Sequence, residues 1–231
     1  DKLVTGVQTC ALPIFERSLL QLPGIRKVIW LSDGLAQDPP LRATVTGKYV
    51  AWGTGGHADQ FVRFADPDTV LLAWPDAGDL HPVARLTRQR MARNLRILAA
   101  ATDTDGRPLS ILRVPTPRVI ERRVTLEEEV DPAWSEAWST EYFPKSEGRK
   151  VGQRLQQVAP ASYLNFVVAN GIVLVPDYEP HGTSTGAQAR VRRLFESAFE
   201  GRRVEFIDAL TVNWYGGGPH CATLNEPAGL G

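Results

Sequence analysis

The feature that most constrains this chain is a strand–strand–helix–strand pattern that occurs twice. In each copy two short strands are joined by a turn, and an amphipathic helix then leads to a third strand. The expected elements are 59–65, 69–74, 81–102 and 109–114 in the first copy, and 161–169, 172–176, 185–201 and 204–207 in the second. The copies lie about 100 residues apart, which predicts an α/β architecture of repeated ββαβ modules.

Local signals support both copies. Residues 69–74 form a continuous apolar run, typical of a strand buried on both faces. Asn170-Gly171 is a strong hairpin-turn signal, and Ser184 or Thr185 is placed to cap the second helix. One stripe of the first helix is apolar, formed by Ala84, Met91, Leu95 and Leu98.

The segments outside the copies are less regular. Short strands are expected at 27–31 and 49–52, with a loop over 32–47 between them. A last strand is expected to begin at 221–224. The charged stretch 124–158 predicts a loop or short-helix insertion, either over a site or on the surface with its aromatic side chains packed on the core; the surface position is favoured.

Composition excludes several classes of protein. The chain has 231 residues and a formal net charge of zero, so nothing electrostatic favours nucleic acid or an anionic membrane as a partner. No apolar window approaches the length of a transmembrane helix. Only two cysteines occur, which predicts no disulfide framework and a reducing, cytoplasmic location.

The first 14 residues look foreign to the rest. They resemble translated sequencing-adapter read-through, and a signal peptide ending near Ala11 fits poorly because polar residues interrupt the apolar run. We therefore expect residues 1–14 to be a non-native segment, Cys10 to carry no function, and residues 15–231 to form part of a catalytic domain that begins further upstream.

Two glycine-rich runs carry the candidate chemistry. One, residues 215–223, contains Cys221, and backbone N–H groups of its glycines can stabilise a thiolate. The other, residues 53–59, contains His57 and Asp59, two residues apart, which on a strand would place both side chains on one face. A thiol nucleophile, an imidazole acid/base and a carboxylate that binds a cation form a workable catalytic set, so we expect the two runs to face each other.

Three groups of residues occur in a characteristic order: 55–74, which reads GGHADQFVRFADPDTVLLAW; 161–176, which contains ASYLNF, ANG and VP; and 216–223, GGGPHCAT. Together they resemble the agmatine deiminase family, whose superfamily includes bacterial peptidyl-arginine deiminases of the Porphyromonas type. The resemblance covers nearly all of residues 16–227. It implies a pentein fold, a five-bladed α/β propeller of ββαβ modules, of which this chain would hold about the last three.

The resemblance also implies an activity, the conversion of agmatine and water to N-carbamoylputrescine and ammonia, a step towards putrescine. Cys221 would attack the guanidinium carbon, His57 would be the acid/base and Asp59 would hold the guanidinium, with no metal or cofactor. Asn165, Gly217 and Gly218 would also bind substrate. The alternatives are a peptidyl-arginine deiminase, which would be secreted, and a catalytically dead fragment.

Two departures from the family pattern bear on the substrate. The family uses an acidic residue far upstream of the His-x-Asp motif, and Asp33 and Asp38 lie too close to His57 to match it. The family commonly has Gly-Gly-Gly-Asn-Ile-His-Cys, whereas Gly218-Pro219 stand here in place of Asn-Ile and Tyr215 in place of the first glycine. The second departure weakens the assignment to agmatine over another guanidine.

The remaining polar residues are expected to be structural. His220 would point away from the site on a strand, Arg63 would pair with a structural carboxylate, and His81 and His181 would lie at a helix start and in a loop. A papain-type hydrolase is a weaker alternative, because its cysteine precedes its histidine in sequence. An incomplete propeller would expose apolar strand edges, so self-association is expected.

Overall fold

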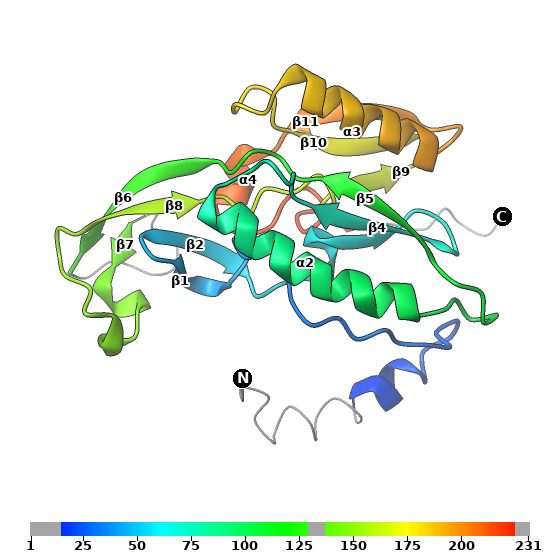
Figure 1. Ribbon diagram of the computed structural model, residues 1–231, viewed down its shortest axis with the longest axis horizontal. Coiled ribbons are helices and arrows are strands. Elements are labelled where there is room, and N and C mark those ends of the chain that lie inside the picture. The colour runs from blue at the N-terminus through cyan, green and yellow to red at the C-terminus, as the bar shows by residue number, and fades with distance from the viewer. Residues whose placement is uncertain (1–14, 129–136, 225–231) are drawn as a thin grey trace.

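The computed structural model describes residues 15–128 and 137–224, so the N-terminal segment 1–14, the stretch 129–136 and the last residues lie outside the described part. Figure 1 shows two helix-bearing units and a separate sheet. The first unit is β3 (Val62–Phe64), β4 (Thr69–Trp74), α2 (Pro82–Ala100) and β5 (Ser110–Pro115). The second is β9 (Val167–Ala169), β10 (Ile172–Asp177), α3 (Thr185–Ala198) and β11 (Arg203–Asp208).

The two units share one topology. In each, the middle strand is antiparallel to the strand before it and parallel to the strand after the helix. The sheets are ordered β3-β4-β5 and β9-β10-β11. The predicted repeat of ββαβ modules is therefore confirmed, and the described part of the chain holds two of them in full.

The elements form for the reasons visible in the sequence. Residues Val70 to Ala73 of β4 are almost completely buried, as expected for a strand covered on both faces. The His81 side chain accepts a hydrogen bond from the backbone of Val83 and so caps α2, while Ser184 caps α3 in the same way. Gly171 has φ 72°, the left-handed conformation that the predicted hairpin turn requires.

The main hydrophobic core joins the two units. It takes buried side chains from both central strands and both helices, including Leu71, Met91, Val175 and Phe195. Phe166 lies in this core edge-to-face with Phe195 and Phe199. Phe166 is one residue from Asn165, so the packing of this core fixes the backbone at one of the predicted site residues.

A third, five-stranded sheet belongs to neither unit. Its order is β1-β2-β8-β6-β7, and Figure 1 shows it at one end of the molecule. The strands are β1 (Pro40–Thr46), β2 (Tyr49–Thr54), β6 (Glu121–Glu127), β7 (Trp138–Ser139) and β8 (Arg154–Val158). Trp138 and Phe143 pack in a small core of this sheet with Val50, Leu126 and Leu155.

The loop predictions for 32–47 and 124–158 are therefore wrong where strands form, at 40–46, 124–127, 138–139 and 154–158. β1 forms a hairpin with β2 through Gly47 (φ 55°), and β2 pairs with β8 about 100 residues away. Because the partner strands lie so far apart in the chain, neighbouring residues in the sequence give no sign of this pairing. The short 3₁₀ turns at Thr140–Tyr142 and Lys145–Glu147 fit the predicted short helices. The part of the predicted insertion at 129–136 lies outside the described residues.

Four predicted strands are wrong or too long. Residues 27–31 form no strand, and a turn at 219–222 stands where the last strand was expected to begin. The strand expected over 59–65 is a 3₁₀ turn, Ala58–Gln60, followed by the short β3. The strand expected over 161–169 is confined to β9, because Ser162 accepts a hydrogen bond from the backbone of Leu164 and holds a turn there.

None of the helices in the described ranges combines the length and the apolar character needed to cross a membrane.

The shared core predicts a large difference between two phenylalanines. Phe195 is fully buried, whereas the side chain of Phe64 is 56% exposed. We expect Phe195→Ala to lower the free energy of unfolding by about 3–5 kcal/mol, and Phe64→Ala to lower it by less than about 1 kcal/mol. Urea unfolding followed by circular dichroism measures both, and equal losses would contradict the packing described.

Candidate active site

Cys221 lies in a turn, and buried side chains hold the glycine run that precedes it. After α4 (Leu210–Trp214), Gly216 and Gly217 take φ values of 80° and 96°, which only glycine adopts readily. The carbonyl of Gly217 accepts a hydrogen bond of 2.7 Å from Nδ2 of Asn213. Asn213 is fully buried, and its Oδ1 accepts a hydrogen bond from the hydroxyl of Tyr178 at 3.0 Å. The core thus fixes the loop that presents Cys221.

The run that carries His57 is held by Asp38. This carboxylate accepts hydrogen bonds from the backbone N–H groups of Thr54 and Gly56 and from the Thr54 hydroxyl. Burial raises the pKa of Asp38, although these hydrogen bonds oppose that shift. Gly56 also packs directly on Gly34, where a Cβ atom would lie 2.4 Å from the Gly56 Cα. The hydrogen bonds to Asp38 therefore hold the loop that ends at His57 in place.

The structure brings the two glycine-rich runs together. One ligating atom each of His57, Asp59 and Cys221 lies within 4.8 Å of the others. The Cys221 Sγ donates a hydrogen bond to Asp59 Oδ2 at 3.2 Å. His57 and Asp59 meet the thiol from a 3₁₀ turn, not from a strand as expected. His57 is exposed, and its side chain has no hydrogen bond to any residue in the described part of the chain.

Asn165 links the groups of the site. It is fully buried, and its Nδ2 donates to Asp59 Oδ2 at 3.0 Å and to Cys221 Sγ at 3.1 Å. Its Oδ1 accepts from the backbone N–H of His220 at 2.9 Å and of Cys221 at 3.4 Å. Both ends of the amide are therefore engaged by the protein. This geometry supports a positioning role, and the predicted direct contact with substrate stays a prediction.

His220 was placed wrongly by the sequence argument. Its Nδ1 lies 2.7 Å from Asp59 Oδ2, so the side chain points into the site. The expectation assumed a strand, on which neighbours such as His220 and Cys221 point to opposite faces. Here the backbone turns instead, with Ala222 N–H donating to the carbonyls of Gly218 and Pro219. The glycine run followed by proline was the available signal for that turn.

The two predicted substrate-binding glycines lie where an added Cβ atom would crowd the site. A Cβ atom on Gly218 would lie 2.5 Å from Asn165 Oδ1, and one on Gly217 would lie 3.1 Å from the Cys221 Cβ. The backbone of Gly218 also hydrogen-bonds the thiol and lowers its pKa, as expected of a nest of N–H groups. Contact of either glycine with substrate stays a prediction.

The electrostatics couple Asp59 to Cys221. Burial raises the pKa of Asp59, but hydrogen bonds from His220 and Cys221 outweigh burial, so the pKa of this carboxyl lies below its usual value. Burial, together with the neighbouring Asp59 carboxylate, raises the pKa of the Cys221 thiol, although Asn165 and Gly218 oppose this. The site therefore holds a thiol and a carboxylate at neutral pH when no cation is bound.

Three further polar residues make contacts away from the thiol. Asp33 forms an ion pair of 2.9 Å with Arg93, so that carboxylate is already occupied, as is Asp38. Arg63 donates to the backbone carbonyl of Phe166 at 3.1 Å and stacks on its ring, so the expected ion pair with a carboxylate is wrong. His181, expected to be an unremarkable loop residue, pairs with Asp208 at 2.9 Å.

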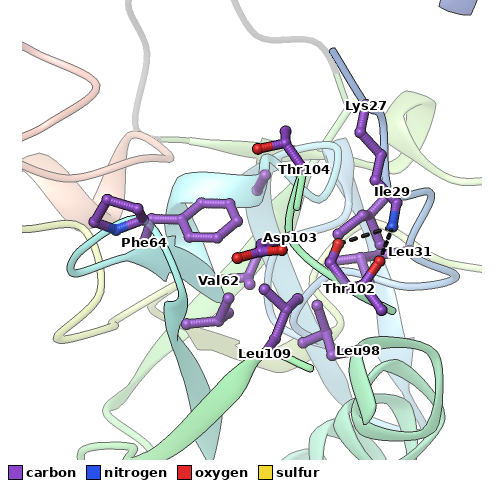
Figure 2. Close-up of a pocket in the computed structure, with 13 residues that line it drawn as sticks. Lys27, Ile29, Leu31, Val62, Phe64, Leu98, Thr102, Asp103, Thr104 and Leu109 are labelled. Atoms are coloured by element: carbon purple, nitrogen blue, oxygen red, sulfur yellow. Dashed lines mark hydrogen bonds between the residues drawn. The ribbon is translucent and has the colours of Figure 1, made fainter. Parts of the chain in front are cut away.

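The structure also contains a separate apolar cavity. It has a volume of about 280 Å³, and its walls include Val62, Leu98 and Leu109. Figure 2 shows Phe64 at one side of it and Lys27, bonded to Thr102, at the other. The cavity meets the His57–Asp59 turn only through Ala58 and is lined by no thiol or imidazole, so we do not assign the chemistry to it.

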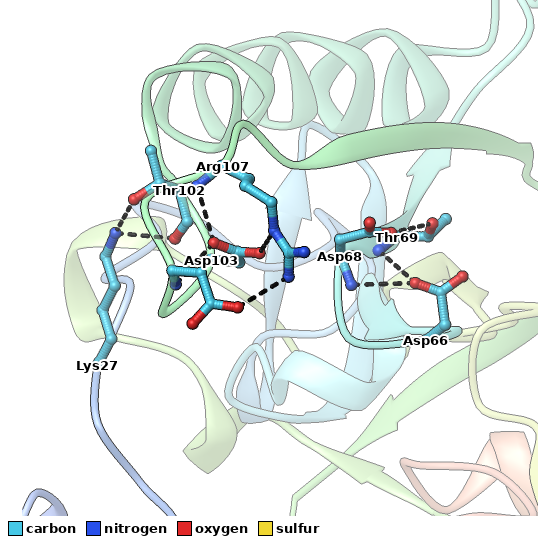
Figure 3. Close-up of polar contacts among 8 residues, drawn as sticks. Lys27, Asp66, Asp68, Thr69, Thr102, Asp103 and Arg107 are labelled. Carbon is cyan, nitrogen blue, oxygen red and sulfur yellow. Dashed lines mark hydrogen bonds and ion pairs between the residues drawn. The ribbon is translucent and has the colours of Figure 1, made fainter.

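Several polar groups at this end of the first unit pair with neighbouring residues. Figure 3 shows Lys27 bonded to the carbonyl and hydroxyl of Thr102 at 2.8 and 2.7 Å. Arg107 forms an ion pair with Asp103 at 2.7 Å, and Asp66 accepts the backbone N–H groups that close the turn into β4. These contacts stabilise the turns at this end of the first unit.

Comparison with known proteins identifies the family. The sequence pattern described as Porphyromonas-type peptidyl-arginine deiminase matches residues 13–227. The chain belongs to this family. A protein of Selenomonas ruminantium named "Putative agmatine deiminase" is 32% identical over 216 residues, which is 92% of this chain and 47% of that protein. The agmatine deiminase of Pseudomonas aeruginosa (strain LESB58) is 27% identical over 213 residues, 92% of this chain and 48% of its own.

Solved structures show the same fold. The agmatine deiminase of Enterococcus faecalis superposes with a TM-score of 0.60 at 22% identity, over 89% of this chain and 46% of that protein. This likeness shows the fold, and the predicted pentein α/β propeller of ββαβ modules is confirmed. The chain spans about half the length of the relatives it matches.

The close packing at Gly218 predicts a selective loss of reactivity. In Gly218→Ala the new methyl group would push Asn165 away from the thiol and the carboxylate. We expect labelling of Cys221 by a cationic haloacetamidine to slow by about tenfold to a hundredfold, because small misplacements of reacting groups are costly.

Gly186→Ala is the matched control. Gly186 lies in the first turn of α3 with open space around its Cα, so the substitution should leave labelling unchanged and can stabilise the helix by up to about 1 kcal/mol. Peptide mass spectrometry after timed labelling measures both variants. Equal rates in Gly218→Ala and wild type would show that the Asn165 contact does not position the thiol.

Proposed function

We propose that this chain carries the catalytic half-site of a guanidine-hydrolysing deiminase that converts agmatine and water to N-carbamoylputrescine and ammonia. One observation carries the proposal: one side-chain ligand atom each of Cys221, Asp59 and His57 lies within 4.8 Å of the others, and the thiol is hydrogen-bonded to the carboxylate. A nucleophile, an anion that attracts a cation and an acid/base are the groups that this reaction needs.

Binding begins at Asp59. The substrate guanidinium is a planar cation, and a carboxylate can hold it by charge-assisted hydrogen bonds. Within the described part of the chain, the hydrogen bonds to Asp59 all end on Oδ2, so Oδ1 is the oxygen that can receive the guanidinium. The guanidinium carbon is thereby held beside the Cys221 Sγ, which removes much of the entropic part of the barrier.

The bound cation also activates the thiol. Burial and the Asp59 carboxylate raise the pKa of Cys221 in the free site, and a guanidinium beside both groups offsets the negative charge of Asp59. His57 accepts the thiol proton, and the thiolate attacks the guanidinium carbon to give a tetrahedral adduct. His57 then returns the proton to the departing nitrogen, and ammonia leaves an S-linked amidino intermediate.

Water completes the cycle. His57 removes a proton from water as the oxygen attacks the amidino carbon, and a second tetrahedral adduct forms. Its collapse breaks the C–S bond, releases the ureido product and returns the proton to the Cys221 sulfur. Asn165 and His220 keep their bonds to Asp59 throughout, which holds the carboxylate in place for both steps.

Agmatine is favoured as substrate by the names of the relatives, whereas the family description favours peptidyl-arginine as the second candidate. The two predict different accessory features. An enzyme of small-guanidine and polyamine metabolism would be cytoplasmic, as the cysteine usage predicts, and a protein-modifying enzyme would be secreted. Self-association through sheet edges also remains a prediction.

Substitution of Asp59 by asparagine should have opposite effects on two electrophiles. Loss of the carboxylate removes one cause of the raised Cys221 pKa, so more thiolate forms at pH 7. Neutral iodoacetamide should then react faster, by about threefold for each unit by which the pKa falls, because a tenfold gain in thiolate is partly offset by lower nucleophilicity. A cationic haloacetamidine should react about 10- to 100-fold more slowly, because a charge-assisted contact is lost.

Asp33→Asn is the control, since Asp33 pairs with Arg93 away from the thiol and should change neither rate. Protection by added compounds then identifies the substrate: agmatine should slow the wild-type labelling more than arginine or an arginyl peptide does. If Asp59→Asn changed both labelling rates in the same direction, the proposed role of Asp59 would be wrong. Stronger protection by the arginyl peptide would favour the second candidate.

A further inference from the structure

The proposed catalytic groups also form a donor set for a soft divalent cation. Cys221, His57 and Asp59 offer one sulfur, one nitrogen and one oxygen ligand atom within 4.8 Å of one another. This is the mixture of ligand types that zinc binds in proteins. We propose that the site binds one Zn²⁺ ion through these three side chains, in competition with the guanidinium substrate. The inference rests on the same residues as the proposed function.

The distances suit a tetrahedral ion with little rearrangement. Zinc lies about 2.3 Å from thiolate sulfur and about 2.0–2.2 Å from nitrogen or oxygen, so its ligand atoms lie about 3.3–3.6 Å apart. Cys221 Sγ and Asp59 Oδ2 are already 3.2 Å apart. His57 is exposed and forms no side-chain hydrogen bond to the described residues, so its ring is free to make the remaining approach of about 1 Å.

Surrounding residues support the ligands as zinc sites require. His220 and Asn165 both hydrogen-bond Asp59 Oδ2, at 2.7 and 3.0 Å, and Asn165 also holds the sulfur. Such outer contacts orient ligand side chains and typically contribute 10- to 100-fold, roughly, to metal affinity. Three protein ligands leave a fourth position of the ion for water.

The binding step is an exchange of cations. In the free site a proton lies between the Cys221 sulfur and Asp59 Oδ2. Zn²⁺ forms a bond to the sulfur, the S–H bond breaks, and the proton leaves to solvent; no electron is transferred. The ion then neutralises the thiolate and the carboxylate together. Because a guanidinium needs the same carboxylate and thiolate, the metal-bound site cannot bind substrate, and zinc acts as a reversible inhibitor.

The test uses metal binding rather than turnover. In a Cys10→Ser background Cys221 is the only thiol, and Co²⁺ can replace Zn²⁺ as a coloured probe whose bond to a thiolate gives a charge-transfer band in the near ultraviolet. We expect one Co²⁺ per chain, displaced by Zn²⁺ and by agmatine. At pH values below the Cys221 pKa, the affinity for Co²⁺ should rise about tenfold with each unit of increase in pH, because one proton is released on binding.

Four variants separate the ligands from their surroundings. Cys221→Ser should abolish the band, and His57→Gln and Asp59→Asn should weaken binding at least about tenfold. His220→Gln should weaken it less than either. His181→Gln is the control, because His181 pairs with a different carboxylate, Asp208, and should leave the affinity unchanged.

Two results would overturn the inference: no Co²⁺ band in wild type that labels normally with the haloacetamidine, or a band that survives Cys221→Ser. The first would leave the deiminase proposal standing. Conversely, stoichiometric metal binding without selective haloacetamidine labelling would support the metal site and contradict the proposed guanidine chemistry.

Discussion

The geometry of the site depends on one carboxylate oxygen. Asp59 Oδ2 accepts hydrogen bonds from Asn165 at 3.0 Å, His220 at 2.7 Å and Cys221 at 3.2 Å. These three contacts join a 3₁₀ turn after β2, the segment before β9 and the turn after α4, which are far apart in sequence. The oxygen therefore fixes the positions of the Cys221 thiol and the His220 imidazole, and its charge adds to burial in raising the pKa of Cys221.

The rest of the fold holds these three segments in place. The shared core of the two ββαβ units includes Phe166, the residue after Asn165. Asn213 reaches from α4 to the carbonyl of Gly217, and Asp38 holds the loop that leads from β2 to His57. Each of these contacts uses a buried polar or apolar side chain, so small changes in the core are transmitted to the distance between the thiol and the carboxylate.

Sequence reasoning predicted the parts of the fold that local patterns determine. The strand β4, the helices α2 and α3, the cap of α3 and the hairpin at Gly171 follow from apolar periodicity and from capping and turn residues. The sheet that joins β2 to β8 was missed, because its strands lie in charged segments whose pairing depends on partners about 100 residues away.

The same distinction applies to the site. The meeting of His57, Asp59 and Cys221 was predicted from the two glycine-rich runs and the family resemblance. The orientation of His220 and the role of Asp38 were not, because both depend on which backbone N–H groups a turn presents, and that is set only when the loops pack against each other.

The most direct measurement is the pKa of Cys221 with and without a bound guanidinium. Thiolate absorbance can be titrated in the Cys10→Ser, His57→Gln protein, which should bind agmatine without turning it over. The pKa should lie above that of an ordinary thiol in the free protein and fall when agmatine is added, because the cation offsets the charge of Asp59. A Cys221 pKa that does not change on saturation with agmatine would contradict the proposed coupling between the carboxylate, the thiol and the substrate.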